Sequence, residues 1–282
     1  RAGAPSWVAP GEALKPGGRW PVWDHVISTM SALNRLSRNR AERPALQNYV
    51  RAKLRPVFDK LGWDGSGSAD DDTTLLRASL ISTLGELGDA DILAEAKRRF
   101  DRFLQDSKSL PNALRDSVTH LAGVTADRAT YDALLDLARR TTVTDERLRY
   151  FYAAASARDA DLARATLALT LTDEVPGTIV TGLINSVASS GEQPDLAWDF
   201  VQKNFDALLV RQGPQFRDQF VANLMTNFSD EAHAAELTAF APAQATSGGR
   251  VMTTRALETI AIATELKARA LPAVDAWVKA PK

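Results

Sequence analysis

Apolar residues recur between residues 110 and 171 at the spacing of one helix face. Three sets show it: Leu114, Val118 and Leu121; Tyr131, Leu134, Leu135 and Ala138; and Leu148, Phe151, Tyr152 and Ala155. Offsets of three, four and seven residues place each set on one side, which is typical of amphipathic helices. The breaks between the sets are short, and short connections make consecutive helices pack as antiparallel hairpins. The pattern therefore predicts a row of helix pairs.

The same periodicity predicts helices along the rest of the chain. They are expected at residues 22–37, 44–61, 73–87, 92–103, 175–188, 196–209, 215–228, 231–240 and 251–278. Proline suits the first turn of a helix, and it stands at the expected starts Pro111, Pro176, Pro194 and Pro214. Thr144 and Ser229 are expected as N-caps, and Pro272 is expected to interrupt the last helix. No segment reads as a strand, so the predicted fold class is all-α.

Helix starts recur at a nearly constant interval, which is 33 residues from Pro111 to Thr144, 32 to Pro176 and 38 to Pro214. A period of this size with two helices per unit indicates an α-solenoid related to HEAT and armadillo arrays. We therefore expect residues 22–282 to form a single helical-repeat domain. Residues 1–21 are rich in Pro and Gly and are expected to be extended, with Trp7 or Trp20 docked on a neighbouring surface.

Residues 64–72 form an acidic, glycine-containing loop with the sequence DGSGSADDD. Consecutive aspartates beside glycines suggest calcium, but an EF-hand needs ligands at alternating positions and a closing Glu, and both are absent. A solvated loop that leads into a helix N-terminus, where acidic side chains suit the helix dipole, is the favoured interpretation.

The composition of the chain excludes several classes of partner and of functional site. The net charge of −1 gives no field that attracts nucleic acid or an acidic membrane, so neither is expected as a partner. No apolar run approaches the roughly 20 residues of a membrane span. The absence of Cys excludes disulfides, thiolate metal sites and cysteine nucleophiles. The chain opens at Arg1 without Met, which suggests a mature product or a piece cut at a domain boundary.

No catalytic or metal-binding constellation is visible in the sequence. A zinc hydrolase needs two His one helical turn apart with a carboxylate, whereas His25, His120 and His233 lie far apart in the chain. A nucleophile elbow, a phosphate loop and a dinucleotide-binding turn are also missing. We therefore expect no catalytic residue, metal site or cofactor in this chain, and His120 is interpreted as a partly buried, hydrogen-bonded helix residue.

A solenoid offers a concave face that suits extended ligands or a neighbouring domain. The candidate ligand contacts on such a face are basic: Arg115, Arg149, Arg217 and Arg250. The alternative is that each is an ordinary solvated arginine. Trp198 and Trp277 are interpreted as core residues rather than ligand platforms.

A series of short motifs recurs in order from about residue 21 to the end of the chain. They are Pro21-Val22-Trp23, Leu61-Gly62-Trp63, Leu75-Leu76-Arg77 after the acidic loop, Leu110-Pro111 through Leu114-Arg115, Thr144-Asp145-Glu146-Arg147, Leu196-Ala197-Trp198-Asp199-Phe200-Val201 with Lys203-Asn204-Phe205, Leu257-Glu258-Thr259-Ile260, and Trp277-Val278. With these motifs the chain resembles the C-terminal helical domain of zinc aminopeptidases of the puromycin-sensitive and endoplasmic-reticulum type.

The resemblance implies a bowl of HEAT-like helix pairs that follows a zinc-binding catalytic domain and a small β-sandwich. In that family the bowl encloses the peptide cavity and contacts the distal part of the peptide. The family's His-Glu-x-x-His zinc motif and Gly-x-Met-Glu-Asn strand do not occur in this sequence. The resemblance therefore implies an accessory domain that is inactive alone, with zinc held in the catalytic domain of the parent chain. Arg250, which follows Gly248-Gly249, is the foremost candidate for a peptide contact.

Two other classes of function remain open at this point. A free-standing HEAT-like scaffold would bind a protein partner along its concave face. A small-molecule enzyme on a helical fold has no motif in its support.

Overall fold

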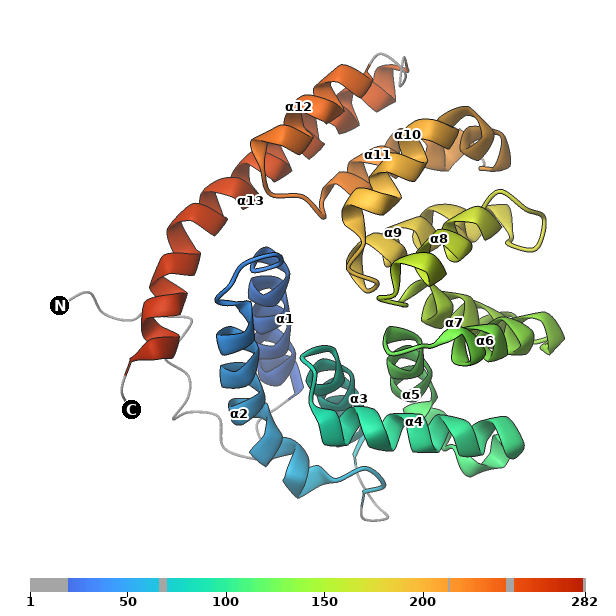
Figure 1. Cartoon of the computed structure of the whole chain (residues 1–282), viewed down its shortest axis with the longest axis vertical. Helices are drawn as coiled ribbons and strands as arrows, with labels where there is room; N and C mark the ends of the chain where they lie inside the picture. The colour runs from blue at the N-terminus through green and yellow to red at the C-terminus, as the bar shows by residue number, and fades with distance from the viewer. Residues whose placement is uncertain (1–19, 66–69, 213, 242–245, 281–282) are drawn as a thin grey trace. The chain divides into compact units, whose positions relative to one another are not determined.

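A computed structural model describes residues 20–65, 70–212, 214–241 and 246–280 of the chain. Within these residues it contains thirteen α-helices and no strand, which confirms the predicted all-α fold class (Figure 1). The helices are α1 (Trp20–Leu36), α2 (Arg43–Leu61), α3 (Asp71–Glu86), α4 (Ala90–Gln105), α5 (Asn112–Val124), α6 (Arg128–Arg140), α7 (Thr144–Ala155), α8 (Ala160–Leu169), α9 (Val180–Ser189), α10 (Pro194–Arg211), α11 (Pro214–Met225), α12 (Glu231–Phe240) and α13 (Ser247–Lys279). Short 3₁₀ turns, η2 (Ser107–Ser109) and η3 (Gly177–Ile179), precede α5 and α9.

The chain divides into two compact units by its internal contacts. Unit 1 comprises Arg1–Glu95, Leu110–Ser117 and Lys267–Lys282, and unit 2 comprises Ala96–Ser109 and Val118–Leu266. The expectation of one repeat domain over residues 22–282, like the solenoid arrangement of its helix pairs, stays a prediction.

Unit 1 has its core among α1, α2 and α3. These helices contact one another and bury apolar side chains from each, among them Trp23, Ile27, Val50, Leu54, Leu80 and Leu84. The C-terminal end of α13 also belongs to this unit. The ring of Trp277 meets the Tyr49 ring edge-on at 4.2 Å, and Arg40 Nη2 donates to Asp275 Oδ2 at 2.7 Å. Trp277 is half-buried, so it stabilises the edge of the core rather than its centre.

Unit 2 is built around α9, which contacts α7, α8, α10 and α11. Val118, Leu121 and the whole stripe at 131–138 are buried in this unit, as predicted, and Leu114 is buried in unit 1. In α7, Phe151 and Ala155 are buried, whereas Leu148 and Tyr152 are half-buried. The Tyr131 hydroxyl lies 2.9 Å from Thr166 Oγ1 and joins α6 to α8 inside the core. Trp198 is buried as predicted, and its indole N–H donates to Glu236 Oε2 at 2.8 Å.

Acidic side chains cap several helices. Asp70 ends the acidic loop as the N-cap of α3, where Asp70 Oδ1 accepts a hydrogen bond from the Thr73 main-chain N–H at 2.7 Å. Asp71 and Asp72 fill the first turn of the same helix, as the dipole interpretation of the loop predicts. The rest of that loop, residues 66–69, lies outside the described residues, as do residues 1–19 with Trp7. Trp20 begins α1, with a side chain outside the described set.

Two predicted N-caps are wrong by one residue. The N-cap of α7 is Val143 rather than Thr144, because the Thr141 hydroxyl accepts from the Val143 N–H and turns the chain one residue earlier. The N-cap of α12 is Asp230 rather than Ser229, because the Asp230 carboxylate reaches the N–H of His233 at 3.0 Å.

The predicted interruption at Pro272 is also wrong, since α13 continues through it to Lys279. Proline removes one main-chain donor and crowds the carbonyl four residues before it, which bends a helix without always ending it. The buried side chains of Leu271 and Val274, on either side of Pro272, hold this part of α13 in the unit 1 core.

Candidate functional site

A polar cleft of about 300 Å³ lies between α9 and α11 in unit 2. Six of the described residues line it: Thr181, Gly182 and Asn185 from α9, Phe220 and Asn223 from α11, and Thr226 just after α11. None of the six carries a charge. This volume is at the lower end of the range for small-ligand sites in proteins. We refer to this feature as the α9–α11 cleft.

The helix pattern of α9 aims its polar side chains into the cleft. Val180, Leu183, Ile184 and Val187 form the buried face of α9. Thr181 and Asn185, four residues apart, therefore share a different and partly exposed face. In α11 the neighbouring Val221 and Leu224 are buried while Asn223 is exposed. The cleft is thus the polar side of two helices whose apolar sides form the core.

A hydrogen bond between two side-chain amides joins the turn after α11 to α9. Asn227 Nδ2 donates to Asn185 Oδ1 at 3.0 Å and also to the Leu224 carbonyl oxygen at 2.9 Å. Asn185 accepts this hydrogen bond through its oxygen. Its Nδ2 donates to no protein atom among the described residues and keeps both protons for a ligand or water. The side chains of Thr181 and Asn223 likewise make no hydrogen bond within the described part of the chain.

Tyr152 of α7 is not itself in the lining, but its phenol hydroxyl lies close to Gly182, which is. Its ring lies so close to Gly182 that a Cβ on Gly182 would stand 3.2 Å from Tyr152 Cζ and overlap the hydroxyl oxygen. Glycine is therefore needed at this position of α9 for the ring to reach it. Burial raises the pKa of Tyr152 above its ordinary value, so the hydroxyl keeps its proton at neutral pH. It makes no protein hydrogen bond within the residues described.

The start of α13 is held by α11 of the same unit. Thr246 Oγ1 donates to Asp218 Oδ1 at 2.5 Å and accepts from the Gly249 N–H at 2.9 Å. Gly248 packs directly on the Asp218 carboxylate. An acidic side chain of the protein itself therefore stands at this helix N-terminus, where an anion is favoured.

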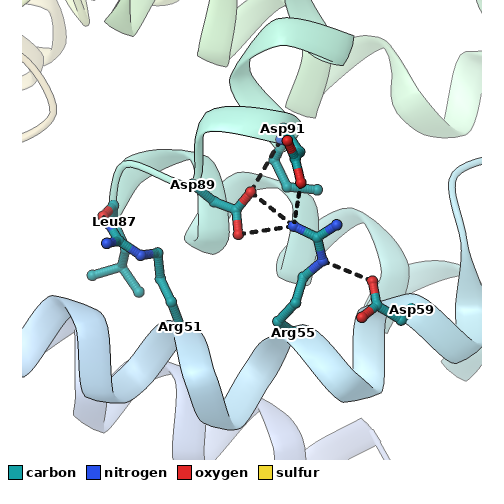
Figure 2. Close-up of polar contacts among 7 residues, drawn as sticks. Arg51, Arg55, Asp59, Leu87, Asp89 and Asp91 are labelled. Atoms are coloured by element: carbon teal, nitrogen blue, oxygen red, sulfur yellow. Dashed lines mark hydrogen bonds and ion pairs between the residues drawn. The ribbon is translucent and has the colours of Figure 1, made fainter.

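A second polar cluster, in unit 1, joins α2 to the turn between α3 and α4 (Figure 2). Arg55 Nη1 donates to both carboxylate oxygens of Asp89, at 3.0 and 3.1 Å, and to Asp91 Oδ2 at 3.3 Å. Arg55 Nε donates to Asp59 Oδ1 at 2.7 Å, and Arg51 donates to the Leu87 carbonyl. The hydrogen bond to Asp59 and the contacts with Asp89 raise the pKa of Arg55 above its ordinary value. These groups satisfy one another, so the cluster fastens helices together and is not the candidate site.

A model of one protein family matches residues 20–262, and its description is "ERAP1-like C-terminal domain". That match covers most of the chain. The chain belongs to the ERAP1-like C-terminal domain family.

Relatives of this ERAP1-like C-terminal domain are longer proteins. Glutamyl aminopeptidase of Mus musculus is 27% identical over 208 residues, which are 72% of this chain and 22% of the relative. Aminopeptidase M1-D of Oryza sativa subsp. japonica is 28% identical over 251 residues, which are 86% of this chain and 28% of the relative. Aminopeptidase M1-A of the same rice is 29% identical over 188 residues, 65% of this chain and 20% of the relative. The chain thus spans between a fifth and three tenths of the length of these curated relatives.

The arginines singled out in the sequence lie elsewhere in this ERAP1-like C-terminal domain. Arg115, in the unit 1 part of α5, donates from Nε to the Leu110 carbonyl at 3.4 Å. Arg149 is half-buried on α7, and Arg250 is exposed in the first turn of α13. The side chain of Arg217, on α11, lies outside the described set. Arg115, Arg149 and Arg250, whose side chains are described, do not line the α9–α11 cleft.

Sequence reasoning missed the cleft because its residues are neutral and ordinary. The available signal was the pair of polar positions Thr181 and Asn185, four residues apart, in a helix with an otherwise apolar or small-residue sequence. Asn223 and Asn227 repeat the spacing at the end of α11. The pattern marks a polar stripe on each helix, but only the packing of α9 against α11 turns two stripes into a cleft.

The histidines of this ERAP1-like C-terminal domain do not fit a zinc site. His120 Nδ1 lies 3.3 Å from Ser156 Oγ, which confirms it as a half-buried, hydrogen-bonded residue. His233 has Asp230 Oδ1 at 2.8 Å from Nδ1 and Asp195 Oδ1 at 3.0 Å from Nε2, so carboxylates occupy both ring nitrogens. Across the described ranges, no three His, Cys, Asp or Glu side chains are arranged to hold a metal ion.

Among the helices that the structure describes, none combines the length and the apolar character that a membrane span needs.

Proposed function

We propose that this chain is the non-catalytic C-terminal domain of a zinc aminopeptidase. In this role it encloses the peptide cavity of the parent enzyme and contacts the distal part of the peptide. Its partners are then the catalytic and β-sandwich domains of the same parent chain, together with the peptide substrate. Zinc belongs to the catalytic domain of that parent.

The observation that carries the proposal is the family match over residues 20–262 together with the share of each relative that the chain covers. Relatives named as aminopeptidases are aligned over 22% and 28% of their length, which leaves most of each outside this region. The absence of a His-Glu-x-x-His motif from the sequence agrees with a role outside the catalytic domain.

Basic side chains extend the proposal to the charged end of a peptide. A free carboxylate is best bound by a guanidinium, which can make two parallel hydrogen bonds to it. Arg250, Arg149, Arg115 and Arg217 are the candidates for this contact. Arg250 ranks first because it is exposed, whereas Arg149 and Arg115 are half-buried.

Two measurements test the proposed function. The 282-residue chain, purified and supplied with zinc, should release no amino acids from peptides, and zinc-dependent release would overturn the proposal. An antiserum raised against the chain should detect a native polypeptide several times larger than 30.6 kDa in source-cell extract. A band near 30.6 kDa under conditions that suppress proteolysis would overturn it in favour of a free-standing scaffold that binds a protein partner.

In the parent enzyme, Arg250→Ala should raise the KM for long peptides with a free carboxyl end and leave kcat unchanged. A substitution that removes binding equal in ground and transition states has this signature. Dipeptide-like substrates, too short to reach a distal contact, should be unaffected. The matched control is Arg164→Ala, another exposed helix arginine of unit 2. Equal effects of both substitutions, or an effect on short substrates, would contradict a distal role for Arg250.

A further inference from the structure

We infer that the α9–α11 cleft binds the main chain of an extended peptide through neutral hydrogen bonds, with Tyr152, Asn185 and Asn223 as its contacts. This inference rests on the proposed function and assigns one part of the peptide to one place in the domain. It differs from the arginine contacts because it needs no charge on the ligand.

The first support is the set of polar groups without a protein partner in the described part of the chain. Asn185 offers its Nδ2 protons, Asn223 offers a complete side-chain amide, and the Tyr152 hydroxyl has a proton to donate. Thr181 adds a hydroxyl that donates and accepts. A peptide main chain presents one N–H donor and one carbonyl acceptor per residue, which is the same mixture of groups.

The second support is electrostatic. No described residue that lines the cleft is charged, so those residues offer no counter-ion to a carboxylate, a phosphate or an ammonium group. Moving an ion from water into a neutral cleft costs more free energy than moving an amide that finds hydrogen bonds there. Neutral amides and hydroxyls are therefore the favoured ligand groups, and a peptide bond is the neutral amide that the parent enzyme encounters.

The third support is the rigidity of the cleft. The amide of Asn227 fixes the orientation of Asn185, and Gly182 allows the Tyr152 ring to rest against α9. Phe220 is buried beneath the lining, so its packing in the core fixes the position of this part of α11. Groups that are already ordered lose little conformational entropy when a ligand binds.

Main-chain recognition has a consequence that side-chain recognition lacks. Affinity should depend on the number of peptide bonds and tolerate changes in side chains. It should also survive when both ends of the peptide are blocked, because no charged group takes part.

The experiment is an NMR titration of the full 282-residue chain with an acetylated, amidated peptide of alternating alanine and serine. We expect saturable shifts of the Asn185 and Asn223 side-chain amides. A second peptide carries esters in place of two central amides and so lacks two N–H donors. It should bind about tenfold more weakly, as expected for the loss of two neutral hydrogen bonds.

Two substitutions assign the contacts. Tyr152→Phe removes only the hydroxyl, and Asn223→Ala truncates an exposed amide, so both chains should fold with an unchanged midpoint of thermal unfolding. Each should weaken binding of the blocked peptide about fivefold. The matched control is Asn112→Ala, which truncates an exposed amide at the start of α5 outside the cleft and should leave the dissociation constant unchanged.

Three outcomes would overturn the inference. The first is equal binding of the ester and the amide peptides, and the second is full affinity in the combined Tyr152→Phe and Asn223→Ala chain. The third is binding that requires a free carboxylate and is lost in Arg149→Ala or Arg250→Ala. The last outcome leaves the proposed function standing and moves the contact to the arginines. Failure of the proposed function is seen separately, in the size of the native polypeptide.

Discussion

Gly123 of α5 lies against the main chain of Ala153 in α7, so close that a Cβ on Gly123 would overlap the Ala153 carbonyl oxygen and stand 2.6 Å from its carbon. The two helices therefore meet backbone to backbone. The obstructing atoms belong to a helix main chain, which cannot move aside as a flexible side chain can. The position tolerates no larger residue without a shift of one helix.

Gly123→Ala should therefore destabilise the protein, although alanine normally favours a helix by about 1 kcal/mol over glycine. We expect a net loss of about 2 kcal/mol or more in the free energy of unfolding, because overpacking forces α5 and α7 apart. Urea unfolding followed by circular dichroism measures it. The matched control is Ala129→Ser, which adds one heavy atom at an exposed helix position and should change the free energy little. A stabilised Gly123→Ala chain would show that the two helices do not approach this closely.

Phe151→Ala should lower the free energy of unfolding by about 3–5 kcal/mol, the usual loss when a buried aromatic side chain is truncated. Phe151 is only 2% exposed and lies on the inward stripe of α7. Val143→Ala, at a position 54% exposed just before α7, serves as the control and should cost little. A loss under about 1 kcal/mol for Phe151→Ala in chemical denaturation would place that side chain at the surface.

Two hydrogen-bond pairs of unit 2 join residues at a separation close to the expected repeat interval, while the solenoid arrangement itself stays a prediction. Tyr131 and Thr166 are 35 residues apart, and His120 and Ser156 are 36 apart. These separations match the intervals of 32 to 38 residues between the expected helix starts. Periodicity predicts most of the helices and the buried faces of α5 and α6, because burial of an apolar stripe dominates helix placement, but in α7 only Phe151 and Ala155 of the predicted stripe are buried.

Hydrophobic periodicity does not fix the ends of the helices. The N-cap of α7 is Val143, one residue before the predicted Thr144, and this position depends on the Thr141 hydroxyl, which lies outside the helix. Pro272 predicts a break in the last helix, but α13 continues through it, with its neighbours Leu271 and Val274 buried. The α9–α11 cleft forms where two helices that are far apart in sequence make contact. Its neutral side chains belong to no sequence motif from which the cleft could be predicted.

Asp127 gives a prediction for the pH dependence of stability. It is the N-cap of α6, and the Thr130 main-chain N–H that donates to Asp127 Oδ1 at 2.8 Å lowers the pKa of Asp127 below its ordinary value. A carboxyl with a lowered pKa in the folded state stabilises the fold fully above its unfolded pKa and loses that effect as pH falls through the folded pKa. Asp127→Ala should therefore shift the urea midpoint at pH 6 and shift it less below pH 3.

Asp127→Asn separates the charge from the cap. Asparagine also caps helices well, so the urea midpoint of the Asp127→Asn chain should lie close to that of the unmodified chain. A pH-independent difference between Asp127→Ala and the unmodified chain would contradict a role for the ionised carboxylate.

Asp89→Asn tests the cluster that fastens α2 to the α3–α4 turn (Figure 2). The Asp89 side chain is 11% exposed. Both of its carboxylate oxygens accept hydrogen bonds from Arg55 Nη1, and Oδ1 also accepts one from the Ile92 N–H at 3.2 Å. Hydrogen bonds to charged groups contribute about 1.5–3 kcal/mol, so we expect a loss of about 2 kcal/mol in the free energy of unfolding.

The control is Asp59→Asn. It removes a carboxylate from the same guanidinium at a site 55% exposed, where an ion pair contributes at most about 1 kcal/mol. Added salt should reduce the effect of Asp59→Asn more than that of Asp89→Asn, because buried pairs are screened less. Equal losses and equal salt responses for the two variants would mean that Asp89 is no more buried than Asp59.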